Sequence, residues 1–159
     1  MLFVFFWLGG CMPALNAAED LNLNRLGARA GKAQKHVFVL FHKEGCSYCE
    51  RMIHESLDNP DIKSKLKQHF ITAIVNINSG GNVTYRDFNG SKHAFAKSLK
   101  IGLYPSVVFM DENRSLVYGF VGYRKRDQFS KVLDYVSSGS YQKMDFESFE
   151  NMLDFEEDN

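Results

Sequence analysis

The chain has 159 residues, of which 45% are hydrophobic and 14% aromatic, and its formal net charge at pH 7 is zero. This length suits one domain with a single core and short terminal appendages. The balanced charge gives no long-range attraction for nucleic acid, so we expect no nucleic-acid partner. The chain contains only three cysteines. It is therefore not a small scaffold held together by disulfides, and its isolated Cys-x-x-Cys indicates redox or metal chemistry.

The N-terminal segment has the pattern of an export signal over residues 1–18. Its first eight residues are almost wholly apolar, but this run is far shorter than the roughly 20 residues that a membrane-spanning helix needs. No Lys or Arg precedes the run, which departs from the usual signal. The stretch Leu8-Gly9-Gly10-Cys11 resembles a lipobox, which would attach lipid to Cys11, whereas cleavage near Ala17 or Ala18 would discard Cys11. We expect a periplasmic or secreted protein and leave lipid attachment open.

The first half of the remaining chain alternates between helical and strand patterns. Apolar residues at mostly helical spacing predict a helix over residues 21–35. Residues 37–41 form a continuous apolar run, typical of a strand covered on both faces. Residues 47–57 again favour a helix, which the Asn59-Pro60 pair interrupts before a second helical piece over residues 61–69.

The second half predicts another buried strand, a loop, two helices and a hairpin. We expect the strand over residues 70–77 and a polar, glycine-bearing loop over residues 78–90. Ser91 has the character of a helix cap for residues 91–99. Residues 107–110 and 116–118 flank a turn and predict an antiparallel hairpin. A helix follows over residues 126–137, and the acidic residues 143–159 keep apolar side chains that suit a short docked helix, with packing or fraying as the simplest interpretation.

The motif Cys46-Ser47-Tyr48-Cys49 follows a predicted buried strand and opens a predicted helix. At a helix N-terminus, unpaired backbone N–H groups and the helix dipole stabilise a thiolate, which lowers the pKa of the Cys46 thiol below the free value of about 8.5. Cys46 is therefore the predicted attacking sulfur. Cys49 lies about one helical turn further on the same side, where it can resolve a mixed disulfide.

Two inert interpretations of the pair compete with this chemistry. The cysteines could form a static disulfide, or they could be half of a zinc site completed by His42 and His54. A structural zinc site needs four well-spaced ligands. The chain has no second Cys-x-x-Cys, and His42 at a strand end and His54 a turn beyond Cys49 make tetrahedral closure awkward. We expect neither a metal nor another cofactor.

On these motifs the chain resembles the thioredoxin superfamily, and within it the periplasmic thioredoxin-like proteins of the SoxW type, which are associated with sulfur oxidation. The likeness spans roughly residues 21–142, and its marks are the strand leading into the cysteine motif, Asp58-Asn59-Pro60, the segment before Pro105, and Gly122-Tyr123. The resemblance implies an α/β thioredoxin fold, with a central mixed β-sheet flanked by helices. It divides the chain into a signal (1–18), a thioredoxin-like domain (20–142) and an acidic extension (143–159).

The resemblance also implies a substrate site beside the cysteines. In this family the proline that matches Pro105 is cis and faces the cysteine pair, and the residue before it, here Tyr104, offers backbone groups to an extended substrate. Ser47 and Tyr48 would complete the substrate-binding surface. Typical members have a tryptophan at the position of Gly45 and a buried aspartate at that of Leu40. The usual proton acceptor for the second cysteine is thus missing, and His42, Glu44 or water are the substitutes.

The resulting hypothesis is an exported thiol-disulfide oxidoreductase that acts mainly as a reductant on substrate proteins and receives electrons from a membrane donor. A disulfide oxidase or isomerase of the same fold is the alternative enzyme. Isomerases usually dimerise, and no separate dimerisation domain fits in this length, so we expect a monomer. The non-enzymatic alternative is a binding module in which the cysteines are merely structural. It would hold a partner in the groove typical of the thioredoxin fold and with its apolar, acidic tail.

Overall fold

The computed structural model describes residues 19–157, and the predicted signal segment, with Cys11, Ala17 and Ala18, lies outside them. Four strands form the central sheet in the order β3-β2-β6-β7. Strand β2 (His36–His42) runs parallel to β3 (Phe70–Asn76) and antiparallel to β6 (Ser106–Met110), which pairs antiparallel with β7 (Leu116–Val121). The predicted fold class, an α/β thioredoxin fold with a central mixed sheet, is confirmed. The hairpin predicted between residues 107 and 118 is β6 and β7.

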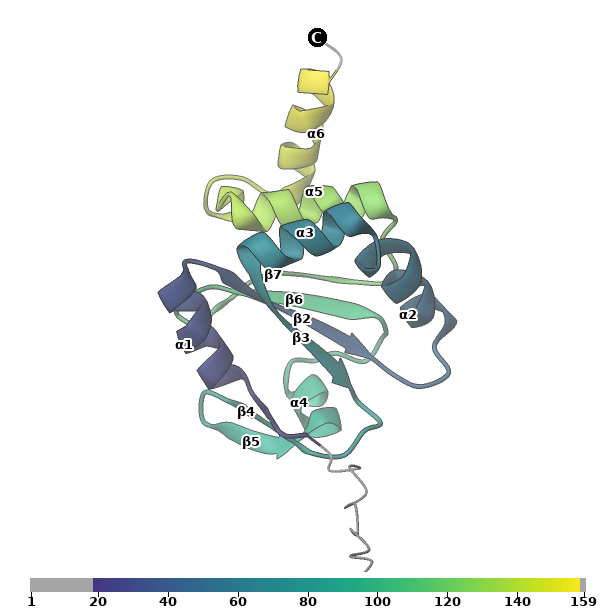
Figure 1. The fold of residues 1–159 in the computed structure, drawn as a ribbon, viewed down its shortest axis with the longest axis vertical. Helices are drawn as coiled ribbons and strands as arrows, with labels where there is room; N and C mark the ends of the chain where they lie inside the picture. Colours follow the sequence, from purple (N-terminus) through teal and green to yellow (C-terminus); the bar gives the residue numbers. More distant parts are fainter. Residues whose placement is uncertain (1–18, 158–159) are drawn as a thin grey trace, which may run out of the picture.

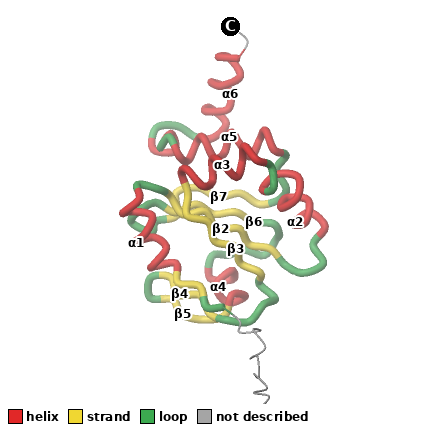
Figure 2. The backbone as a smooth tube through the Cα atoms, viewed as in Figure 1, coloured by secondary structure: helices red, strands yellow, loops and turns green. Residues whose placement is uncertain are grey.

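Helices cover both faces of this sheet and give the molecule three layers (Figures 1 and 2). One face carries α1 (Leu23–Ala33) and α4 (Lys92–Ser98). The other carries α2 (Ser47–Arg51), the π-helical turn η1 (Met52–Leu57), α3 (Pro60–His69) and α5 (Arg126–Ser137). The 3₁₀ turn η2 (Ser140–Gln142) leads to α6 (Phe146–Glu157). In Figure 1, α6 extends away from the body beyond α5.

The continuous apolar pattern of β2 places it at the centre of the core. Its five middle residues are buried and alternate between the two faces of the sheet. Phe38 and Leu40 join the hydrophobic cluster under α3 and α5, whereas Val37, Val39 and Phe41 join the cluster under α1 and α4. Because β2 is buried on both faces, the end of this strand is a fixed platform for the cysteine motif that follows it.

Helix boundaries follow the capping residues. Asn59 accepts hydrogen bonds from the Asp61 and Ile62 backbone N–H groups, and Pro60 takes the first helical position of α3. The predicted Ser91 cap is confirmed, since its hydroxyl accepts from the Ala94 N–H. The first helix begins at Leu23 rather than residue 21, because Leu21–Asn22 form the short strand β1 and Asn22 caps the helix.

Two sequence expectations are wrong. The segment 78–90 is not a loop: β4 (Asn82–Tyr85) and β5 (Phe88–Ser91) form an antiparallel hairpin that joins β1 in a second, three-stranded sheet. Strand β3 is not buried on both faces along its length: it lies at the edge of the central sheet, where the helices cover it only in part. Thr72 and Ile74 therefore stay exposed, and Ile74 is 53% accessible.

The C-terminal helix packs on the domain through apolar side chains between Phe146 and Leu153. Phe149 is buried, and Phe146 and Leu153 contact the same hydrophobic cluster as α5. The Tyr135 hydroxyl donates a hydrogen bond to the Met144 carbonyl, which fixes the approach to α6. These contacts correspond to the packing that was expected of the tail, over residues 146–153 of the helix.

We predict that Phe129→Ala lowers the free energy of unfolding by about 3–5 kcal/mol, because it removes a fully buried ring from contact with Phe38 and Phe120. Urea unfolding of the oxidised protein, followed by circular dichroism, measures this loss. Leu116→Ala is the control, since Leu116 is 46% exposed and its truncation should change stability by no more than about 0.5 kcal/mol. Equal losses in the two variants would contradict this account of the core.

Candidate active site

The cysteine motif begins in the turn that leaves β2. Gly45 has a φ of +66°, a conformation that suits glycine, and it turns the chain into the helix. Cys46 is the N-cap residue of α2, and its Sγ accepts a hydrogen bond from the Cys49 backbone N–H at 3.2 Å. The predicted helix over residues 47–57 is present, but its second half is the π-helical turn η1, marked by the Asp58 N–H bond to the Ile53 carbonyl.

Cys46 and Cys49 form a disulfide, with an S–S distance of 2.10 Å and Cα atoms 5.2 Å apart. The two residues differ in exposure: Cys46 is 8% accessible and Cys49 only 1%. Cys46 therefore presents the outer sulfur, and Cys49 is covered by the domain. This arrangement can form and break one bond between two sulfurs, which is a two-electron change.

A second loop approaches the outer sulfur. The Tyr104–Pro105 peptide bond is cis, as the resemblance implies, and the Tyr104 carbonyl oxygen lies 3.7 Å from Cys46 Sγ. Pro105 is buried, and burial raises the pKa of the Tyr104 phenol. The Ser106 hydroxyl donates a hydrogen bond to the Leu103 carbonyl at 2.7 Å, and this bond within the loop stabilises its conformation.

Several exposed side chains lie in the segments that carry the disulfide and Pro105, and at the end of the neighbouring strand. Ser47 and Tyr48 both lie in the first turn of α2 and are exposed, Tyr48 by 61%. Leu103, next to Tyr104, is 70% exposed, and Val121 at the end of β7 is 54% exposed. Val121 pairs in register with Ser106, directly after Pro105. The structure thus brings Cys46, Cys49, Ser47, Tyr48, Tyr104 and Pro105, the sequence-predicted site residues other than Cys11, to one end of the sheet.

The residues considered as proton acceptors or zinc ligands lie in different environments. Leu40, which occupies the position of the missing acceptor and is itself no candidate, is fully buried within the core. His42 ends β2 half-buried, and this burial lowers the pKa of its imidazole against the opposing effect of Glu44. His54 faces solvent and pairs with Asp58 at 3.1 Å. Within residues 19–157, no cluster of three or more His, Cys, Asp or Glu residues has the geometry to hold a metal ion.

A group of interacting residues links α2 and η1 to the loop after β7 and was not predicted from the sequence. Arg51 and Glu55, in α2 and η1, form a two-pronged ion pair, and Tyr123 from the loop after β7 donates a hydrogen bond to Glu55. Buried Ser56 donates to the Arg124 carbonyl of the same loop. The i,i+4 spacing of Arg51 and Glu55 on a predicted helix was the available signal for their pairing, but nothing in the sequence indicated its contact with Tyr123.

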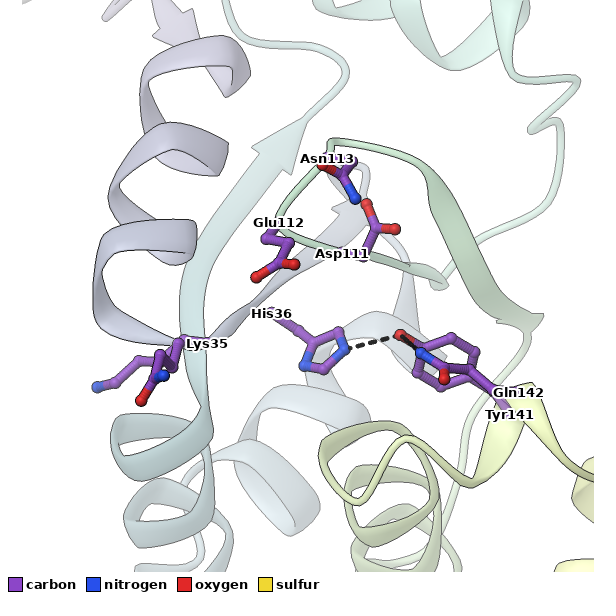
Figure 3. A pocket seen from close by; sticks show the side chains of 8 residues that line it. Lys35, His36, Asp111, Glu112, Asn113, Tyr141 and Gln142 are labelled. Carbon is purple, nitrogen blue, oxygen red and sulfur yellow. Dashed lines mark hydrogen bonds between the residues drawn. The ribbon is translucent and has the colours of Figure 1, made fainter.

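A polar cavity of about 330 Å³ lies at the other end of β2, where His36 begins the strand (Figure 3). The His36 Nε2 atom and the Tyr141 hydroxyl are 3.1 Å apart. Asp111 and Glu112 belong to the turn between β6 and β7, and their side chains lie near the His36 ring (Figure 3). Burial lowers the pKa of His36, against the effect of these two carboxylates. The length of β2 separates this cavity from the disulfide.

None of the described helices is long and apolar enough to cross a membrane.

Solved structures with the same fold include two bacterial proteins at about one quarter identity. A thioredoxin-fold protein from Helicobacter pylori is 26% identical, with a TM-score of 0.62, and the match covers 76% of this chain and 80% of that one. A thioredoxin from Thermus thermophilus is 25% identical, with a TM-score of 0.57 over 73% of this chain and 84% of that one. The reduced C-terminal domain of DsbD from Neisseria meningitidis shares the fold at 21% identity and a TM-score of 0.52, over 70% and 91% of the two chains.

No curated protein matches the sequence. The family model described as the thioredoxin-like domain matches residues 24–137, which include both cysteines of the disulfide, Tyr104 and Pro105. This match agrees with the sheet order, the position of the disulfide at the start of α2 and the cis bond before Pro105. The chain belongs to the thioredoxin-like domain family.

Proposed function

We propose that this protein is an exported thiol-disulfide oxidoreductase that reduces disulfides in substrate proteins through Cys46 and Cys49. One observation carries the proposal: the disulfide lies at the start of a helix, with its outer sulfur 3.7 Å from the carbonyl oxygen that precedes Pro105. A sulfur in this position is stabilised as a thiolate by the helix N-terminus and can be reached by a polypeptide lying along the loop.

The reaction consists of two thiol-disulfide exchanges. In the reduced protein, the Cys46 thiolate attacks one sulfur of a substrate disulfide, forms a mixed disulfide and releases the other substrate sulfur as a thiolate. The Cys49 sulfur, after losing its proton, attacks Cys46, re-forms the Cys46–Cys49 bond and releases the second substrate sulfur. The substrate gains two electrons and the cysteine pair loses two. A separate donor, in our proposal a membrane protein, returns these electrons.

Substrate binding is assigned to the surface around the outer sulfur. The Tyr104 backbone would pair with an extended substrate segment, with Pro105 shaping the loop. Ser47 and the exposed ring of Tyr48 would contact the substrate beside its cysteine. The exposed apolar side chains of Leu103 and Val121 support this assignment, because large accessible apolar groups gathered at one place commonly mark interaction sites.

The direction of electron flow depends on the redox potential of the pair. Related folds range from about −270 mV for thioredoxin to about −120 mV for a strong periplasmic oxidant. We propose a potential near the lower end, which makes the protein a reductant of the kind suggested by its resemblance to SoxW-type proteins. The proposal of export rests on the signal-like pattern of residues 1–18. The exported protein would then consist of the thioredoxin-like domain, residues 20–142, and the acidic extension, residues 143–159.

Alkylation of the reduced protein should distinguish the two sulfurs. We predict that iodoacetamide at neutral pH modifies Cys46 several times faster than Cys49, because Cys46 is more accessible and lies at the helix start. Peptide mass analysis after short reaction times measures both rates. Slow modification of Cys46, at or below the rate of Cys49, would favour a merely structural disulfide.

Substitution of each cysteine should have a different result. We predict that Cys46→Ser abolishes insulin reduction, since the attacking sulfur is lost, whereas Cys49→Ser accumulates mixed disulfides that cannot be resolved. Insulin turbidity with dithiothreitol as donor measures the first, and non-reducing gels measure the second. Cys11→Ser is the matched control and should retain full activity. Full activity in Cys46→Ser would refute the proposed function.

Export should leave a mature protein that lacks its first residues. We predict that the full chain expressed in a Gram-negative host appears in the periplasmic or membrane fraction with a shortened N-terminus. Intact mass distinguishes cleavage near Ala17 or Ala18 from a lipid-modified Cys11, and Cys11→Ser removes only the second product. Unprocessed protein confined to the cytoplasm would contradict export.

A further inference from the structure

The loop after β7 joins the two parts of the candidate site. The Gly122 backbone N–H donates to the Pro105 carbonyl at 2.8 Å, which ties the loop to the segment facing the disulfide. Two residues later, the Arg124 carbonyl accepts from the Ser56 hydroxyl at 2.7 Å, and Ser56 is fully buried in η1. The loop therefore connects the Pro105 segment to the same helical stretch that begins at the disulfide.

A polar cluster of three side chains reinforces this connection. Tyr123 donates its hydroxyl proton to the Glu55 carboxylate. The Arg51 guanidinium bonds both oxygens of that carboxylate, at 3.1 and 3.2 Å, and lies 4.4 Å from the centre of the Tyr123 ring. Each of the three residues contacts the other two, so the Tyr123 ring is held from its face and from its hydroxyl.

The exposure of this cluster indicates what it does. The Arg51 and Glu55 side chains are each 49% exposed, and exposed ion pairs contribute little to folding stability. Its side-chain hydrogen bonds join the three residues to one another and not to either sulfur of the disulfide. The cluster is therefore built to orient the loop rather than to stabilise the fold or to activate a sulfur.

The loop that it orients continues the exposed apolar surface of the site. Val121 immediately precedes Gly122, and its register partner Ser106 follows Pro105. The Tyr104 carbonyl lies 3.7 Å from the outer sulfur, and the next carbonyl along the chain, that of Pro105, bonds Gly122. A polypeptide bonded through its cysteine to Cys46 would therefore lie against the Tyr104–Pro105 segment and the loop that is tied to it. A small disulfide molecule needs only the sulfur itself.

We propose that Tyr123, held by Glu55 and Arg51, is a positioning residue that fixes one wall of the site for polypeptide substrates. This inference rests on the proposed function and adds to it a means of distinguishing protein disulfides from small ones. It assigns the cluster to substrate binding, with little influence on the sulfur exchange.

Tyr123→Phe tests the proposal, because it removes the hydroxyl and keeps the ring beneath Arg51. In single-turnover oxidation of the reduced full chain by insulin, quenched with acid and followed by thiol labelling, the half-saturating insulin concentration should rise about threefold to tenfold, the effect of losing one solvent-exposed hydrogen bond of ordinary net strength. The maximal rate should change by less than about twofold. The reaction of Cys46 with a small aromatic disulfide should also stay within about twofold.

Two further variants complete the experiment. Glu55→Gln keeps an acceptor for Tyr123 but loses the charge that holds Arg51, and should raise the half-saturating concentration by a smaller factor. Tyr141→Phe is the matched control: it removes a hydroxyl that bonds His36 at the opposite end of β2, and it should leave insulin saturation unchanged.

The outcomes separate this inference from the proposed function. An unchanged half-saturating concentration in Tyr123→Phe would overturn the inference, as would an equal loss of reactivity toward insulin and toward the small disulfide. Neither result affects the proposed function while Cys46→Ser remains inactive. If the unsubstituted protein fails to reduce insulin, the proposed function fails, and the inference fails with it.

Discussion

Cys46 is both the N-cap residue of α2 and one half of the disulfide, so the hydrogen bond from the Cys49 backbone N–H to Cys46 Sγ ties the helix start to the sulfur chemistry. Backbone N–H groups in the first turn of a helix have no carbonyl partner within the helix. Here the Cys49 N–H donates to both the Cys46 carbonyl oxygen, at 2.9 Å, and the Cys46 Sγ, at 3.2 Å. The position of the pair is consequently set by the point where the helix begins, which is fixed in turn by the end of β2 and by the turn at Gly45.

Around this start, three segments distant in sequence reach the same place through backbone contacts. The Tyr104 carbonyl faces the outer sulfur, the Pro105 carbonyl bonds Gly122, and the Arg124 carbonyl bonds Ser56 in the helical stretch that began at the disulfide. Backbone atoms thus form most of the frame, and the exposed side chains are left to meet a partner. In the function proposed above, a site of this kind would accept varied polypeptides, because main-chain groups are common to all of them.

Patterns in the sequence were sufficient for the central sheet, for most helices and for the cysteine pair. Residues 37–41 formed a continuous apolar run, and residues 126–137 had a clear helical period. Asn59-Pro60 and Ser91 marked helix starts by known capping chemistry. The β4–β5 hairpin escaped prediction because its two-residue turn is Arg86-Asp87 rather than a glycine-containing pair, although Val83 and Tyr85 alternate inward. The Tyr123 cluster also escaped, since contacts between residues nearly 70 positions apart leave no local signal.

The burial of β2 on both faces has a consequence for how the domain unfolds. Phe38 and Leu40 belong to one hydrophobic layer, and Val37, Val39 and Phe41 to the other, yet all five share a single stretch of backbone. Neither layer can open without pulling on the strand that anchors the other. The two halves of the interior are therefore expected to melt together as one cooperative unit, and the geometry of the sulfur pair persists until that single transition.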